Sequence, residues 1–136
     1  IFLRTKEIDK INNYLLESNG IKNLLDFKTG LSPGLFIRFN EAYLKYNIDK
    51  NEDILIKIDK LLKSYKKNND KILINLTLFL VDQYFYKLSQ IHGKKLDFLQ
   101  KKKSSILKNI NEFIYYNLNI NSVLNSIKVD LQNVLR

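Results

Sequence analysis

The sequence predicts an all-α protein in two parts, a short three-helix unit over residues 1–47 and a helical bundle over residues 51–136. Three observations support this fold class. Apolar residues recur at steps of three and four along almost the whole chain, as they do on one face of a helix. No segment alternates apolar and polar residues for long enough to form a sheet. The 45% hydrophobic content of the 136 residues is ample for a packed core.

The first part is expected to hold three short helices. The first begins after Thr5, which can cap it, and ends near Gly20. Its apolar stripe consists of Ile8, Ile11 and Leu15. The second spans residues 22–28 and stops at Gly30, and the third starts at Pro33. The apolar positions of the third helix are Phe36, Phe39, Tyr43 and Tyr46.

The bundle is expected to begin near Asn51 with a one-sided helix. Its apolar stripe is Ile54, Leu55, Ile58, Leu61, Leu62 and Tyr65, and the opposite side carries Lys57, Lys60 and Lys63. A turn is expected over residues 66–70. The next helix, from Lys71 to about Ile91, is apolar nearly all round. Such a helix is buried by several neighbours, so we expect it at the centre of the bundle.

Two further helices complete the prediction. One runs over residues 94–116, and Lys103 falls where its stripe calls for an apolar residue, which predicts a bend or an exposed first turn there. The asparagine-rich residues 117–121 interrupt this helix, and Asn121 or Ser122 can cap the last one. The apolar positions of the last helix are Val123, Leu124, Ile127, Leu131, Val134 and Leu135.

The chain is basic, with 23 Lys and Arg against 14 Asp and Glu, a formal net charge of +9. Lysine supplies nearly all of this charge, and it is abundant together with asparagine and isoleucine, as in proteins encoded by AT-rich genomes. Arginine, which makes bidentate contacts to phosphate and guanine, occurs at only three positions: Arg4, Arg38 and Arg136. Net charge is therefore weak evidence for nucleic-acid binding.

Composition also bounds location and chemistry. The absence of cysteine excludes disulfides and cysteine-ligated metals, and we expect a cytoplasmic protein without metal or cofactor. The single histidine, His92, lies beside Gly93 and is expected to cap a helix or face solvent. The most apolar run, residues 72–81, is far shorter than the roughly 20 residues that span a bilayer. No membrane partner is expected, and the first residues do not resemble a signal peptide.

No catalytic constellation is evident. The scattered carboxylates are expected on solvated helix faces: Glu52, Asp82, Asp97 and Glu112. Ser104 and Ser105 have no base near them in the sequence, which makes a nucleophilic role improbable. The sequence contains neither of the two glycine-rich phosphate-binding motifs, G-x-x-x-x-G-K-[ST] and G-x-G-x-x-G. We therefore expect no catalytic residue in this chain.

Two features are candidate binding groups. The lysine run Lys101, Lys102 and Lys103 can lie along a phosphate backbone, although a solvated helix face is the simpler interpretation. Several tyrosines are interleaved with charges: Tyr43, Tyr46, Tyr65, Tyr115 and Tyr116. Tyrosines in such positions can stack on bases, but beside leucines at helical spacing they are more typical of a core or of the rim of an interface.

Two short motifs resemble AAA+ clamp-loader subunits. The turn formed by Ser32, Pro33 and Gly34 resembles the start of the third lid helix, and Asn117, Leu118 and Asn119 resemble the string before the final collar helix. The order of three short helices and about four long ones is similar to an AAA+ lid followed by a collar. The chain most resembles the delta-prime family of bacterial DNA polymerase III clamp-loader subunits.

This resemblance implies a structural role rather than catalysis. It implies a lid-like unit and a collar that joins the other loader subunits, which together place the sliding clamp on primed DNA. The family's lid arginine position is occupied here by Leu35, so we expect no support of ATP hydrolysis. Residues 1–3 look like the end of a strand or linker, which implies an upstream nucleotide-binding-like domain.

Two alternatives stay open. The chain is also compatible with the collar of the related ATPase subunit, which an intact upstream phosphate-binding lysine would indicate. An unrelated helical nucleic-acid-binding module would instead bind with a steep dependence on salt.

Overall fold

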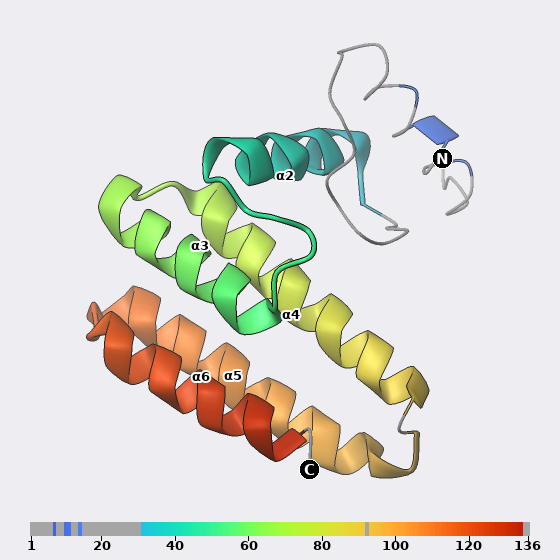
Figure 1. Ribbon diagram of the computed structural model, residues 1–136, viewed down its shortest axis with the longest axis vertical. Helices are drawn as coiled ribbons and strands as arrows, with labels where there is room; N and C mark the ends of the chain where they lie inside the picture. Colours follow the sequence, from blue (N-terminus) through green and yellow to red (C-terminus); the bar gives the residue numbers. More distant parts are fainter. Residues whose placement is uncertain (1–6, 8–9, 12–13, 15–30, 92, 135–136) are drawn as a thin grey trace. The chain divides into compact units, whose positions relative to one another are not determined.

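The computed structural model describes residues 7, 10–11, 14, 31–91 and 93–134 of the chain, and Figure 1 shows their arrangement. All regular secondary structure in these residues is helical, which confirms the all-α prediction. The chain divides into two compact units, Ile1–Glu52 and Asp53–Arg136. This division falls a few residues after the boundary expected from the sequence.

In the first unit, helix α2 spans Pro33–Lys45 and begins at the proline expected from the sequence. The backbone N–H of Leu35 donates to Oγ of Ser32 at 3.5 Å, so the serine caps the helix as expected. At the other end Asn47 takes a left-handed conformation with φ 54°. The N–H of Ile48 then donates to the Tyr43 carbonyl at 2.9 Å, and the buried Ile48 side chain completes this C-terminal cap.

The apolar stripe of α2 is buried at Phe36, Phe39 and Tyr43, whereas Tyr46 is half-buried. The buried Asn40 donates from Nδ2 to the Phe36 carbonyl at 2.9 Å. The predicted second helix and the Gly30 stop lie outside the described residues. Of the predicted first helix only residues 7, 10–11 and 14 are described; they are helical, but Ile11, expected on the buried stripe, is 37% exposed.

The second unit is a bundle of four helices. They are α3 (Ile54–Asn68), α4 (Lys71–Ile91), α5 (Leu96–Tyr116) and α6 (Ile120–Val134), with a short 3-10 turn, η1 (Gly93–Lys95), before α5. Short connections make consecutive helices antiparallel neighbours (Figure 1). Helix α3 packs against α4 and α6, and α5 packs against the same two. Buried side chains from all four fill the centre, among them Ile58, Val81, Ile110 and Ile127.

Three sequence predictions for the bundle differ from the structure. Helix α4 is not central: within the bundle it is one of four helices around a shared core, in contact with α3 and α5. Its extra apolar residues do not require a central place, because Ile74, Leu78 and Phe79 are only half-buried. Helix α3 continues to Asn68 through the expected turn, and Asn69, with φ 55°, ends it.

The third difference concerns lysine. Lys57, expected on the solvated side of α3, is buried, Lys60 is half-buried and only Lys63 is exposed. The long methylene stem of lysine allows such burial against apolar neighbours. The prediction of a bend or an exposed first turn at Lys103 was wrong, because α5 is one continuous helix that begins at Leu96 and Lys103, well beyond its first turn, is half-buried beside Asp82.

Candidate interaction surface on helix α5

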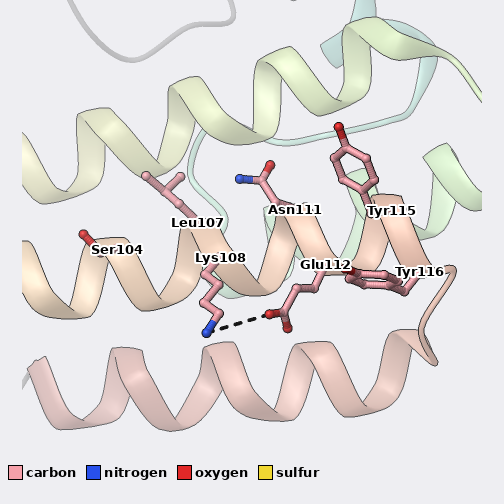
Figure 2. A pocket seen from close by; sticks show the side chains of 7 residues that line it. All are labelled: Ser104, Leu107, Lys108, Asn111, Glu112, Tyr115 and Tyr116. Carbon is pink, nitrogen blue, oxygen red and sulfur yellow. Dashed lines mark ion pairs between the residues drawn. The ribbon is translucent and has the colours of Figure 1, made fainter.

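The outward face of α5 carries two parallel rows of side chains (Figure 2). One row is Leu107, Asn111 and Tyr115, and the other is Ser104, Lys108, Glu112 and Tyr116. Residues at four-residue steps form a ridge, and the groove between two ridges receives the ridge of a second helix that packs against it. This groove, called here the α5 groove, is a surface hollow of about 470 Å³. It follows the helix for about 18 Å at 1.5 Å per residue.

Two tyrosines flank one end of the α5 groove. Tyr115 is 85% exposed and Tyr116 is 73% exposed, more than any other aromatic residue in the described part of the chain. Their ring centroids lie 6.4 Å apart with the planes tilted by 48°. Tyrosine joins a large apolar surface to a hydroxyl and loses little rotamer freedom when it is buried, so it is enriched where proteins associate. These two tyrosines are therefore the best anchors that the groove offers.

The groove ends at the corner between α5 and α6, where the motif Asn117, Leu118 and Asn119 lies. Asn117 terminates α5 in a left-handed conformation with φ 49°. The side chain of Asn119 accepts from the N–H of Asn121 at 2.9 Å, and its carbonyl accepts from Val123. Leu118, between them, is 37% exposed. The motif therefore builds a tight corner and adds an apolar side chain to the exposed end.

The prediction that Asn121 or Ser122 caps the last helix was wrong. Helix α6 begins at Ile120, and Asn121 is already inside it. The side chain of Asn119 instead accepts from one of the first free N–H groups of α6, that of Asn121, because it reaches forward two residues in the turn.

The lysine run is largely neutralised within the bundle. Nζ of Lys102 lies 3.6 Å from a carboxylate oxygen of Asp130 on α6, and Nζ of Lys103 lies 2.6 Å from Asp82 on α4. Lys102 also lies over the ring of Phe98, 5.6 Å from its centroid. Of the three lysines of the run, Lys101 alone is exposed and makes no ion pair with another described residue. From Lys103 to Asn117 the distance along α5 is about 21 Å at 1.5 Å per residue. The run and the asparagine corner are thus separate features.

Sequence reasoning missed a polar cluster between α5 and α6. Ser105 Oγ donates to Asp130 Oδ2 at 2.8 Å, while the other oxygen of Asp130 faces Lys102. Ser105 thus does contact a carboxylate, but the carboxylate is also held by a lysine, and this supports a structural role. Asp130 belongs to no sequence motif. Its pairing depends on how α5 and α6 are aligned, which the sequence pattern alone does not give.

The lid-like motif lies on the first turn of α2, in the other unit. Ser32, Pro33 and Gly34 form its cap and first residues, and Leu35 is half-buried. Arg38, one turn along, is exposed. A Cβ added to Gly34 would meet no atom of the described residues within 4 Å, so no close contact among them requires glycine at this position.

Other chemistry in the described residues is sparse. They contain no group of three or more His, Asp or Glu side chains placed to hold a metal, and His92 lies outside them. Burial, and then the nearby charge of Asp53, raises the pKa of the Tyr84 phenol above its ordinary value. Among the helices described, none combines the length and apolarity that crossing a membrane requires.

The chain was compared with known proteins at three levels. No protein-family model, no curated protein and no solved structure matches it. Its function is therefore argued from the geometry above and from the two motifs.

Proposed function

We propose that this chain is the lid and collar part of a delta-prime subunit of a bacterial DNA polymerase III clamp loader. In this proposal the bundle is a structural module that assembles with neighbouring subunits, which together place the sliding clamp on primed DNA. The chain itself takes no part in catalysis and acts in the cytoplasm.

The observation that carries this proposal is the position of the asparagine motif. Asn117, Leu118 and Asn119, which resemble the collar string, form the corner directly beyond Tyr115 and Tyr116. The motif therefore lies where the α5 groove ends, next to the two most exposed aromatic side chains of the described residues. A helix from a neighbouring subunit can place its own ridge in that groove and bury both tyrosines.

The charges of the bundle favour assembly over nucleic-acid binding. A phosphate backbone is bound by cations that are free to exchange their counterions. Lys102 and Lys103 already face Asp130 and Asp82. A duplex or single strand would have to compete with both carboxylates. The basic run thus supports helix packing within the bundle, and the nucleic-acid module is the weaker alternative.

The proposal is tested by the affinity of the chain for a purified ATPase subunit of the same loader. The double variant Tyr115→Ser/Tyr116→Ser removes both anchors without touching the core, because both side chains are exposed. Central interface tyrosines contribute more than about 1 kcal/mol each, so binding should weaken at least about tenfold. Fluorescence anisotropy of labelled chain measures the change.

The matched control is Ile56→Ser/Val129→Ser, which removes two exposed apolar side chains from α3 and α6. This variant should bind within about twofold of the parent chain. Equal weakening by both variants, or no binding of the parent chain to any loader subunit, would contradict the proposal.

A further inference from the structure

The end of the bundle where α4 meets α5 carries an exposed apolar group that the proposed function does not use. This α4–α5 tip consists of residue 91 and residues 93–101. Ile91, the last residue of α4, is 73% exposed, and Leu96, the first of α5, is 50% exposed. Phe98 is 39% exposed and lies under the ammonium of Lys102. Large apolar side chains gathered at one end of a helical pair indicate a contact surface.

A small hollow lies beside these residues, between α4 and α5. Its volume is about 150 Å³. Phe85 and Leu99, each 4% exposed, form its apolar base, and Leu96 lines it as well. A cavity of about this volume is known to hold a benzene ring. The hollow therefore has room for one large apolar side chain of a partner.

Polar groups line the rest of the hollow. Ser89 and Gln100 provide neutral hydrogen-bonding groups, and Asp82 and Lys103 are present as an ion pair. The negative charge of Asp82 is thereby compensated by a lysine of the same hollow. Because Lys103 compensates the charge of Asp82, this ion pair does not repel an anionic partner in the hollow.

The tip itself is basic. Lys94, Lys95 and Lys101 are exposed, and none of them makes an ion pair with another described residue. Asp97 is the acidic residue of the tip, so three free lysines outnumber it. Uncompensated charge next to an apolar hollow favours a partner of opposite charge that also supplies an apolar side chain.

We propose that the α4–α5 tip binds an acidic segment of a protein partner, which seats one large apolar side chain in the hollow between α4 and α5. Carboxylates of the segment face Lys94, Lys95 and Lys101. A nucleic acid matches the lysines but leaves the exposed aliphatic groups without a partner. Against an anionic lipid surface, the ring of Phe98 is engaged by Lys102 rather than free to enter a bilayer. This surface is distinct from the α5 groove, and the inference does not depend on the clamp-loader proposal.

The test uses a labelled ten-residue peptide with five aspartates around one phenylalanine, titrated with the full chain and followed by fluorescence anisotropy. Two matched peptides replace the aspartates by asparagine or the phenylalanine by alanine. Both should bind at least about tenfold more weakly, and binding of the parent peptide should weaken as salt rises. Phosphatidylglycerol vesicles and a 20-nucleotide single strand are assayed alongside.

The variant Lys94→Gln/Lys95→Gln/Lys101→Gln should weaken peptide binding about tenfold, as expected for three exposed charges acting together. Its control, Lys66→Gln/Lys67→Gln/Lys71→Gln, changes the net charge equally at exposed lysines elsewhere and should change binding less than twofold. Leu96→Ala should weaken the phenylalanine peptide but not the alanine peptide.

Three results would overturn the proposal. The first is the absence of saturable binding of the aspartate–phenylalanine peptide. The second is an equal loss of peptide affinity in the tip lysine variant and in its control lysine variant. The third is tighter binding of the vesicles or of the single strand, with peptide binding no stronger than that of the asparagine control.

Discussion

Replacement of Asp130 by alanine should destabilise the bundle more than any other single change at a charged residue discussed above. Asp130 joins α5 to α6 through Ser105 at 2.8 Å and Lys102 at 3.6 Å, and its side chain is only 13% exposed. A hydrogen bond to a charged acceptor contributes about 1.5–3 kcal/mol. The ion pair is long and its lysine is 24% exposed, so it adds no more than about 0.5 kcal/mol. We expect a loss of about 2 kcal/mol.

Asp130→Asn separates the two contributions. Asparagine keeps a neutral oxygen for Ser105 but gives up the charge, so it should destabilise the bundle by about 1 kcal/mol. Urea unfolding followed by circular dichroism gives the free energies, and a loss of 2 kcal/mol lowers the midpoint by about 1 M. Hydrogen exchange of the α6 amides locates the effect.

Asp82→Ala is the informative control. Its ion pair with Lys103 is shorter, at 2.6 Å, but the Asp82 side chain is 55% exposed. Because solvent screens exposed pairs, we expect a loss of only about 0.5 kcal/mol. If Asp82→Ala destabilises the bundle as much as Asp130→Ala does, then burial is not what gives the α5–α6 cluster its strength and the reasoning fails.

Under the clamp-loader proposal the protein should not hydrolyse ATP, and Leu35→Arg alone should not create turnover. ATP turnover that is lost on Arg38→Ala would contradict this role of the lid-like motif. Glutamine at residues 101–103 should leave the salt slope of DNA binding nearly unchanged, whereas three real phosphate contacts would lower it by about three. The free energy of unfolding should fall as pH rises above 10.0, because the folded state raises the pKa of Tyr84. Tyr84→Phe should reduce that fall. If the variant and the parent chain show the same dependence of stability on pH, the contribution of Tyr84 is excluded.

Helix α2 and the helices of the bundle were predictable because their signals are local. The proline and glycine of the lid-like turn, the apolar stripes and the asparagine corner all act over a few residues. Pro33 was expected to begin a helix and does, and the helix expected from Lys71 to Ile91 has those bounds.

The end of α3 and the cap of α6 were misplaced by a few residues, whereas the errors about burial and pairing arose where packing between helices decides the outcome. The apolar stripe in the sequence shows which face of α4 is apolar. The number of helices that contact α4 depends instead on how the other helices pack in the bundle. The pairing of Lys102 with Asp130 and the burial of Lys57 depend likewise on residues far away in sequence. The exposure of Tyr115 and Tyr116, next to buried Phe113, follows from which side of α5 lacks a neighbour.

The central claim is that this bundle assembles with clamp-loader subunits. The most direct test is to reconstitute a bacterial DNA polymerase III loader without its delta-prime subunit, add this chain, and weigh the complexes by analytical ultracentrifugation. The account predicts that one copy of the chain enters the complex through its bundle and that Tyr115→Ser/Tyr116→Ser prevents this. A chain that stays outside the complex at concentrations where authentic delta-prime enters would contradict the claim.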